Sequence, residues 1–288
     1  MDYIDLDGRK IKESSAQDKL LSFLYTTVPG RLLLKPLVHP LVSIIAGKFL
    51  STPLSTNLIP SFLKNSNIDL DEYIPTTYTS FNDFFSRKIR PENRPVCTEK
   101  NILISPCDCR ATVYPINDNS IFTIKNRNYT IASLLRSPSL AEKYRGGYAY
   151  ILRLTVSDYH RYVYAASGKK TKNYKIHGIF HTVNPVANDY SPIYIENTRE
   201  YTIIHTVQFR DVLQMEVGAL LVGKISNHEN VATVKKGTEK GYFEYGGSTI
   251  IVLTEKNAVQ PRGDLLRNTQ IDCETKILQG QELGRTAL

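Results

Sequence analysis

The chain has few cysteines, and their spacing excludes two common uses of this residue. The four are Cys97, Cys107, Cys109 and Cys273, and they form neither a Cys-x-x-Cys pair nor a Cys/His spacing of the zinc type. Cys107 and Cys109 cannot form a disulfide across regular extended backbone without a kink. We therefore expect reduced thiols in a cytoplasmic setting and no metal site.

Long apolar runs are also missing. The segment from Met1 to Glu13 has no apolar core of the kind found in secretory signals. Further along, Arg31, Lys35 and Lys48 interrupt the apolar residues before about 18 of them accumulate, so no membrane-spanning helix is predicted.

Acidic residues are absent between Asp18 and Asp69. The same stretch carries five basic residues: Lys19, Arg31, Lys35, Lys48 and Lys64. It also holds apolar runs such as Leu41-Val-Ser-Ile-Ile45. This composition suits the surface of an anionic bilayer, but it equally suits a helical subdomain that packs on the rest of the protein with a basic rim.

The bulk composition is that of a globular protein with an anionic partner. The chain has 288 residues, 41% of them hydrophobic and 22% charged, with a formal net charge of +8. It lacks an RNA-recognition aromatic motif, zinc-finger spacing and a basic heptad region, so nucleic acid is the weaker candidate for that partner.

The order of elements predicts the α+β class. Residues 14 to about 64 have helical patterning interrupted by prolines, whereas short β-rich runs separated by turns follow from about residue 102. The clearest of these runs are Ala149–Val156, Tyr201–Val207, Val217–Ile225 and Thr249–Leu253. We expect a helical, basic and apolar region over 1–64 and a mostly antiparallel, β-rich domain over 65–288.

The stretch Gly241-Tyr-Phe-Glu-Tyr-Gly-Gly-Ser-Thr249 contains an unusual interruption. Paired glycines weaken a strand, because they pack nothing and lose the most backbone entropy on folding. Gly246 and Gly247 therefore indicate either a β-bulge or chemistry on the Gly247–Ser248 peptide bond. A Gly-x-Ser-x-Gly nucleophile elbow is excluded, since Ile250 stands where its second glycine is needed.

Two other residues could take part in such chemistry. His160 follows a strong strand directly, where a scaffold holds a side chain firmly, and Asp158 and Arg161 lie beside it. Asp108 sits in a small apolar turn, where it caps the turn or serves the site. The other five histidines are better explained as core or surface residues.

Taken together, the motifs resemble the phosphatidylserine decarboxylase family. The motifs occur in the family's order from about residue 20 to the C-terminus: Phe81-Asn-Asp-Phe-Phe-Ser-Arg87 with Arg94-Pro95, Ser105-Pro-x-Asp108, Asp158-Tyr-His-Arg161, Val183-Asn-Pro185, Val217-Gly-Ala219 with Val222-Gly223, and Gly241-Tyr-Phe-x-Tyr-Gly-Gly-Ser-Thr249. Each motif alone is weak, but the ordered set is specific.

The resemblance implies a proenzyme that cuts itself between Gly247 and Ser248. Ser248 would attack the preceding carbonyl with His160 as general base and Asp108 orienting His160, which follows the logic of a serine triad. The products would be a β chain, 1–247, and an α chain, 248–288, that remain associated. Ser248 would become a pyruvoyl group, the covalent cofactor that forms a Schiff base with the substrate amine and accepts the electrons left by CO2.

The implied substrate is phosphatidylserine and the implied product phosphatidylethanolamine, with His160 protonating the substrate carbon and no metal required. The resemblance places the protein peripherally on the cytoplasmic face of the cell membrane, with the helical region 1–64 facing the membrane and 65–288 as the catalytic domain. Phe84 and Phe85 are expected near the lipid entrance, and a homo-oligomer is possible.

The chain departs from the family pattern at a few positions. Val163 stands where many relatives have a second histidine, and Cys109 stands where they usually have glycine. These changes leave two rival functions open, a non-catalytic relative that binds anionic lipid and a pyruvoyl decarboxylase of a soluble amino acid. Whether Asp108 or Asp158 is the partner of His160 also stays open.

Overall fold

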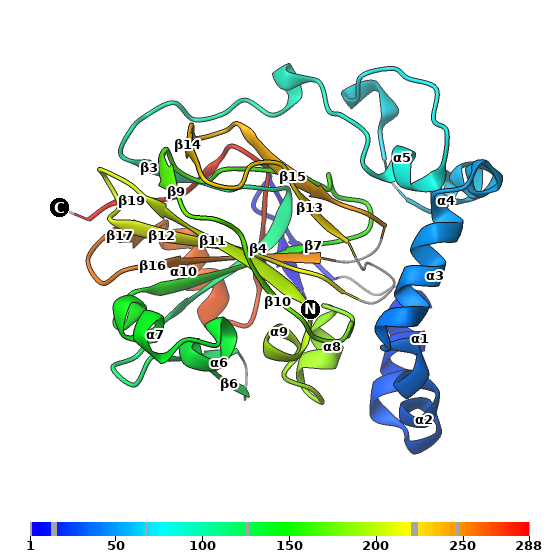
Figure 1. Ribbon diagram of the computed structural model, residues 1–288, viewed down its shortest axis with the longest axis horizontal. Coiled ribbons are helices and arrows are strands. Elements are labelled where there is room, and N and C mark those ends of the chain that lie inside the picture. Colours follow the sequence, from blue (N-terminus) through cyan, green and yellow to red (C-terminus); the bar gives the residue numbers. More distant parts are fainter. Residues whose placement is uncertain are drawn as a thin grey trace.

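The structure is a computed structural model that describes residues 2–12, 16–66, 68–124, 127–219, 224–245 and 248–287. It combines a large, mostly antiparallel sheet with N-terminal helices over residues 16–65, which stand along one side of the β body and are called the helical column below (Figure 1). The predicted α+β class is confirmed.

In the described part of the chain, the large sheet has eleven strands. They are β1 (Tyr3–Ile4), β2 (Lys10–Ile11), β4 (Cys109–Pro115), β7 (Tyr148–Leu154), β9 (Gly168–Lys170), β10 (Tyr174–Ile176), β11 (Arg199–His205), β12 (Asp211–Val217), β14 (Ala232–Val234), β16 (Ser248–Thr254) and β18 (Glu274–Ile277). Their order is β14-β9-β11-β12-β16-β7-β4-β18-β1-β2, with β10 paired to β11. Only the β1–β18 pair is parallel among the described pairings of this sheet.

Smaller sheets complete the β body. Their strands are β3 (Ile102–Ile104), β5 (Ile121–Ile124), β6 (Arg127–Thr130), β8 (Arg161–Val163), β13 (Ile225–Asn227), β15 (Glu239–Phe243), β17 (Val259–Pro261) and β19 (Glu282–Thr286). They pair as β13-β15-β8, as β17-β19-β3 and as the hairpin β5-β6.

The helices lie mainly in the N-terminal part and between the strands. They are α1 (Ala16–Thr26), α2 (Val28–Leu37), α3 (Pro40–Leu50), α4 (Ile59–Asn65), α5 (Phe81–Phe85), α6 (Ile131–Leu135), α7 (Pro138–Tyr144), α8 (Pro185–Asn188), α9 (Ile193–Glu196) and α10 (Gly263–Gln270), with 3-10 turns η1 (Pro53–Leu58), η2 (Leu70–Glu72) and η3 (Pro91–Asn93).

Strand β16 is central because both of its faces are apolar. Successive side chains of a strand point to opposite faces. Ile250 and Val252 lie in the core that contains β8 and β15 residues, whereas Ile251 and Leu253 lie in the core that contains α1, α6 and α9 residues. A continuous apolar run is what a strand covered on both faces requires.

The helical column turns sharply between α1 and α2. Thr27 Oγ caps α2 by accepting a hydrogen bond from the Gly30 N–H at 3.1 Å. A Cβ at Gly30 would lie 2.1 Å from the Phe23 carbonyl oxygen, so only glycine allows the two helices to approach this closely.

The predicted helical region over 1–64 is wrong at its N-terminal end. Residues 2–12 form β1 and β2, and β1 pairs with β18 at one edge of the large sheet. A turn with Gly8 at φ 79° joins the two strands. Strands of two residues are too short to produce a recognisable alternation, and the parallel partner lies at the far end of the chain.

The predicted strands are confirmed in three cases. β7, β11 and β16 match the expected runs within two residues at each end. The expected strand over Val217–Ile225 is wrong. One strand, β12, already ends at Val217, and the next strand, β13, begins only at Ile225. Residues 220–223 lie outside the described part.

No single described helix is long and apolar enough to cross a membrane. Helix α2 and residues Leu41–Leu50 of α3 reach that length and composition only together, across a bend of 65°.

Candidate active site

Ser248 is the first residue of β16 and is fully buried. It lies opposite Leu154, the last residue of β7, and its strand is also paired with β12. The central position follows from the apolar run that starts two residues later. Gly246 and Gly247 lie outside the described residues, so the expected cleavage junction is described only on its Ser248 side.

His160 lies beside Ser248 as the motifs predicted. It follows β7 through a turn in which the Asp158 carboxylate accepts hydrogen bonds from Thr155 N–H at 2.7 Å and Thr155 Oγ–H at 2.8 Å. This turn brings the imidazole Nδ1 to 3.4 Å from Ser248 Oγ. The structure therefore brings two of the three predicted catalytic residues together.

The hydrogen bond of His160 Nε2 determines which nitrogen of the imidazole can act as a base. His160 Nε2 lies 3.0 Å from the Thr155 carbonyl oxygen, which can only accept a hydrogen bond. We therefore assign the ring proton to Nε2, and Nδ1 is left as the acceptor that faces the Ser248 hydroxyl. Burial, with a smaller contribution from the Arg87 charge, lowers the pKa of His160 to about 3 against the opposing effects of Asp158 and Thr155. The imidazole is thus neutral at pH 7.

The expected contact between Asp108 and His160 is not formed, and we correct it. The Asp108 carboxylate accepts hydrogen bonds from Arg94 Nε at 2.9 Å and Arg94 NH2 at 2.7 Å, and from the Gln279 N–H at 2.8 Å. Burial raises the pKa of the Asp108 carboxyl, and the bonds from Arg94 and Gln279 oppose this rise. The orienting position at His160 Nε2 is taken by the Thr155 carbonyl instead.

Asp108 nevertheless influences the position of His160 indirectly, because it binds Gln279, which in turn binds the residue after His160. The Gln279 side-chain amide donates to the Arg161 carbonyl at 2.9 Å and to the Pro106 carbonyl at 3.1 Å. Asp108 therefore fixes the turn that holds the residue next to His160. Asp158 also acts indirectly, because it holds the Thr155 turn.

Phe84 and Phe85 do not lie at the surface, so they are not membrane contacts in this structure, whereas their expected position near the lipid entrance stays a prediction. Both are fully buried in the core around α5. The Phe85 ring lies on the His160 imidazole, with 4.1 Å between ring centroids and 32° between planes. Phe85 thus covers the site, and neither ring contacts a bilayer in this conformation.

Helix α5 also holds the chain just before the expected junction. The Tyr245 N–H donates to Asn82 Oδ1 at 3.1 Å, and the Tyr245 ring lies between Phe81 and Phe85 at 4.9 and 5.1 Å. Helix α5 begins with Ser80 as N-cap and is fixed to η1 by the bond from Phe81 N–H to Ser55 Oγ at 2.9 Å.

Two departures from the family pattern leave the Ser248–His160 pair intact. Val163 lies in an apolar cluster with Ile102 and Ile104, away from the imidazole's hydrogen bonds. Cys109 is not among the residues with positive φ, so this turn does not require glycine. The four cysteines are free. Within the described residues no group of three or more His, Cys, Asp or Glu side chains could hold a metal ion.

The sequence patterns missed two parts of the site. The Thr155 carbonyl is a backbone group and leaves no mark in side-chain motifs. Gln279 lies near the C-terminus, more than a hundred residues from each of its three partners, and no short motif joins such positions. Arg94 does stand in one of the motifs, but the sequence alone does not show that its guanidinium pairs with Asp108, fourteen residues away.

The arrangement at Ser248 fits conversion of that residue into a pyruvoyl group. A buried hydroxyl faces a neutral imidazole acceptor, and it stands on a strand that stays paired on both sides if the preceding bond breaks.

Comparison with known proteins gives a consistent result. The family model described as phosphatidylserine decarboxylase matches residues 81–285. "Phosphatidylserine decarboxylase proenzyme 2" from Clostridium acetobutylicum is 42% identical over 275 residues, which cover 95% of this chain and 94% of that protein. "Phosphatidylserine decarboxylase proenzyme" from Clostridium tetani is 40% identical over 278 residues, with the same coverage of the two chains. A protein of that same name from Clostridium botulinum strain Alaska E43 is 38% identical over 283 residues, or 96% of each chain.

Proposed function

This chain belongs to the phosphatidylserine decarboxylase family, and we propose that it removes CO2 from phosphatidylserine to leave phosphatidylethanolamine after cutting itself at Gly247–Ser248. The observation that carries the proposal is the buried Ser248 hydroxyl, which faces the acceptor nitrogen of a neutral imidazole at 3.4 Å.

In the first step of maturation, Ser248 Oγ attacks the Gly247 carbonyl carbon while its proton passes to His160 Nδ1. The peptide C–N bond then breaks, the Ser248 nitrogen takes up a proton, and an ester remains between the two residues. Loss of the Cα proton of residue 248 expels the Gly247 carboxylate. Water then replaces the nitrogen, which leaves as ammonia, and the C-terminal piece begins with a pyruvoyl group.

The pyruvoyl group, once formed, supplies an electron sink for the pair of electrons left by departing CO2. The surrounding residues do the rest. His160 Nδ1 takes up the proton that the substrate ammonium group must lose before it reacts and passes it to the substrate carbon, while the Thr155 carbonyl keeps the ring oriented. Phe85, whose ring is tilted by 32° to the imidazole at 4.1 Å, and Phe243, edge-on at 6.5 Å, exclude water from it.

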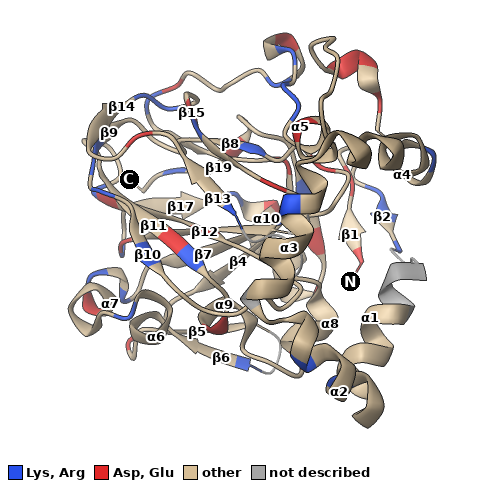
Figure 2. Cartoon of the chain, turned by 45° about the vertical axis from the view of Figure 1, so that its right-hand side comes forward, with Lys and Arg blue, Asp and Glu red and all other residues tan. Residues whose placement is uncertain are grey.

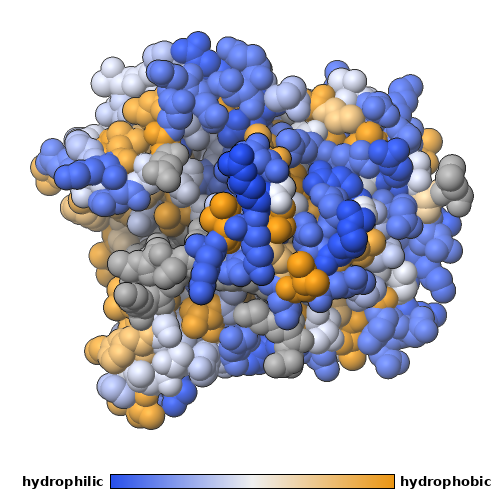
Figure 3. Space-filling model, turned by 180° about the vertical axis from the view of Figure 1, so that it is seen from behind, coloured by the Kyte–Doolittle hydropathy of each residue, from blue (hydrophilic) through white to orange (hydrophobic). Residues whose placement is uncertain are grey.

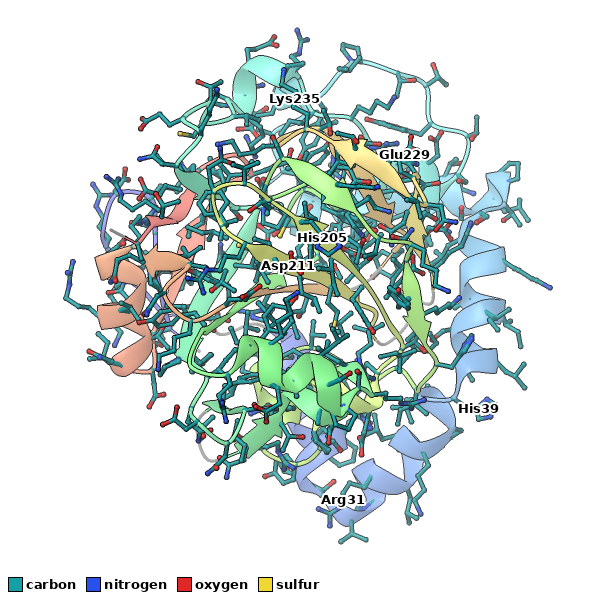
Figure 4. All side chains as sticks on the ribbon, turned by 60° about the vertical axis from the view of Figure 1, so that its left-hand side comes forward. Arg31, His39, His205, Asp211, Glu229 and Lys235 are labelled. Atoms are coloured by element: carbon teal, nitrogen blue, oxygen red, sulfur yellow. The ribbon has the colours of Figure 1, made fainter. Side chains whose placement is uncertain are left out.

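We further propose that the helical column lies on the membrane surface. The column exposes large apolar side chains, namely Leu20, Phe23, Val28, Leu32, Leu33, Leu41, Ile44, Ile45, Phe49, Leu54 and Leu58. Figure 2 shows basic but no acidic residues on α2 and α3, and Figure 4 shows Arg31 and His39 pointing away from the β body. Hydrophobic residues also gather along this side in the view from behind (Figure 3).

An exposed apolar and basic face of this kind suits a peripheral protein that draws a lipid substrate from an anionic bilayer. The face lies beside the site, because α3 contacts α5 through the bond from Asn82 Nδ2 to the Gly47 carbonyl at 3.2 Å. Asn82 also holds Tyr245, which precedes the junction.

The experiment that tests the proposal is the intact mass of the purified protein, followed by CO2 release from phosphatidylserine labelled in its carboxyl group. We expect pieces 1–247 and 248–288, the second lighter by one ammonia than a piece beginning with serine. Ser248→Ala should remain uncut and inactive. An uncut wild-type chain with unmodified Ser248 sinks the proposal. Lipid binding without CO2 release supports a non-catalytic relative, and activity on a soluble amino acid without liposome binding supports the other rival.

A further inference from the structure

Arg87 is a buried cation without a carboxylate partner. Only 3% of the residue is exposed, and no ion pair to its guanidinium occurs within the described residues. Burying a charge is costly unless an opposite charge or several hydrogen bonds compensate for it. Buried cations at the other end of the same segment are compensated, as the Arg94–Asp108 pair shows.

The bonds that Arg87 does make leave donors unused. Its NH2 donates to the Tyr73 hydroxyl at 3.1 Å and its NH1 makes a long contact of 3.4 Å with the Phe84 carbonyl. The guanidinium carbon lies 4.2 Å from the Tyr73 ring centroid and 4.9 Å from that of Phe84. Among the residues that the structure describes, the buried Nε has no hydrogen-bond partner. Such an unused donor in a native structure calls for an explanation.

The position of Arg87 links it to the catalytic pair. Arg87 follows α5 by two residues, and Phe85, the last residue of α5, packs against the His160 imidazole with 4.1 Å between ring centroids. The Arg87 guanidinium donates to the Tyr73 hydroxyl, and the Tyr73 ring centroid lies 6.1 Å from that of Tyr159, the residue before His160. The Arg87 charge also makes a small contribution to the lowered pKa of His160.

We propose that Arg87 binds the phosphodiester of the substrate headgroup, an inference that rests on the proposed function. The substrate carries two anionic groups, a carboxylate and a phosphodiester. A guanidinium on the carboxylate would stabilise the charge that disappears as CO2 leaves, and it would therefore slow the reaction. The phosphodiester keeps its charge throughout, so a bond to it holds the substrate equally in the ground and transition states. Arg87 is thus a specificity-determining residue.

The test compares Arg87→Gln with wild type, using phosphatidylserine in micelles of an uncharged detergent. We expect KM to rise about 10- to 100-fold while kcat changes little, because binding that is uniform along the reaction affects KM alone. Arg87→Lys, which keeps the charge but loses the planar donors, should lie between the two. Lys88→Gln is the matched control, since Lys88 is the exposed neighbouring cation and should leave KM unchanged.

A second measurement does not depend on any variant. Glycerophosphoglycerol, a soluble phosphodiester without amine or carboxylate, should compete with the substrate of the wild-type enzyme, and neutral glycerol should not. Absence of competition overturns the inference. So does a cut Arg87→Gln enzyme with wild-type KM, or an equal effect of Lys88→Gln. Failure of the proposed function is distinguishable, because the wild-type chain itself would then remain uncut or release no CO2.

Discussion

His160 is held in an environment that disfavours its charged form, and this has a consequence for stability. Its pKa of about 3 in the folded protein lies below the ordinary value of 6.5. The unfolded chain therefore binds the proton more readily, so the contribution to stability is complete above pH 6.5 and is lost as the pH falls from 6.5 toward 3. At pH 5 the loss amounts to about 2 kcal/mol.

This loss is measurable by urea unfolding of the uncut Ser248→Ala protein at pH 7.5 and pH 5. The double variant Ser248→Ala with His160→Gln is the control, because it is also uncut and cannot take up the proton at this position. We expect the control to lose about 2 kcal/mol less than Ser248→Ala between the two pH values. Equal losses would contradict the burial argument.

The two aspartates near His160 should both matter, and neither should be indispensable. Asp108→Asn weakens the clamp on Arg94 and Gln279, and Asp158→Asn loosens the Thr155 turn. Each aspartate acts on His160 only through other residues that position the ring. We therefore expect each variant to cut itself about 10- to 100-fold more slowly, which is the size of effect that a small misplacement of a catalytic group produces.

The rates can be followed on denaturing gels after synthesis in a cell-free extract. His160→Gln should not cut at all, and Asp71→Asn, a change at an exposed aspartate, should cut like wild type. Complete loss of cutting in either Asp108→Asn or Asp158→Asn would instead assign that carboxylate a direct role.

At the scale of single residues, the sequence predicted the reactive pair, Ser248 and His160, but not the groups that hold His160 in position. Ser248 and His160 stand in short motifs whose residue types indicate their chemistry. The group that orients His160 is a backbone carbonyl, and Asp108 is joined to Arg161 through a residue near the C-terminus. Contacts of these kinds depend on tertiary packing, which short motifs do not encode.

Among the elements, helices α2 and α3 carry the surface that we assign to the membrane. Leu32 and Ile45 are 63% and 67% exposed. If both enter the bilayer interface, replacing them with serine removes about 1.5–3 kcal/mol of apolar transfer free energy each at full burial. We expect Leu32→Ser with Ile45→Ser to weaken binding to phosphatidylserine vesicles at least tenfold and to leave activity in detergent micelles close to wild type.

Vesicle sedimentation measures this binding, and Val207→Ser is the matched control. Val207 is 94% exposed, but it lies in the turn between β11 and β12, which Figure 4 marks by His205 and Asp211. Equal weakening of vesicle binding by Val207→Ser, or unchanged vesicle binding of the double variant, would contradict the proposal that the helical column contacts the membrane.

The acid-free run from Asp18 to Asp69 allowed the column to be predicted as a helical, basic and apolar region. The expected helical region also included residues 1–13, which is wrong because residues 2–12 form β1 and β2. Phe84 and Phe85, expected as candidate membrane or substrate contacts, are buried in the core around α5. Apolar residues satisfy a buried core as well as a bilayer, so composition alone does not distinguish α5, which is buried, from α3, which is exposed.

For the whole molecule, the proposed cut leaves two pieces that are interleaved in one sheet. From the C-terminal piece, β16 lies between β12 and β7, and β18 lies between β4 and β1. All four neighbours belong to the N-terminal piece. Ile250 to Leu253 are fully buried. Breaking one peptide bond removes none of these contacts, so the pieces should stay together until the sheet itself unfolds.

The cut changes the unfolded state instead, because unfolding now releases two chains. The unfolding free energy of the cut protein should fall by about 1.4 kcal/mol for each tenfold dilution, whereas that of uncut Ser248→Ala should not depend on concentration. Urea unfolding at two protein concentrations, with both proteins eluting alike from a sizing column beforehand, measures the difference. Pieces that separate on the column without denaturant, or a cut protein whose midpoint ignores dilution, would show that the sheet does not hold them in the way its strand order requires.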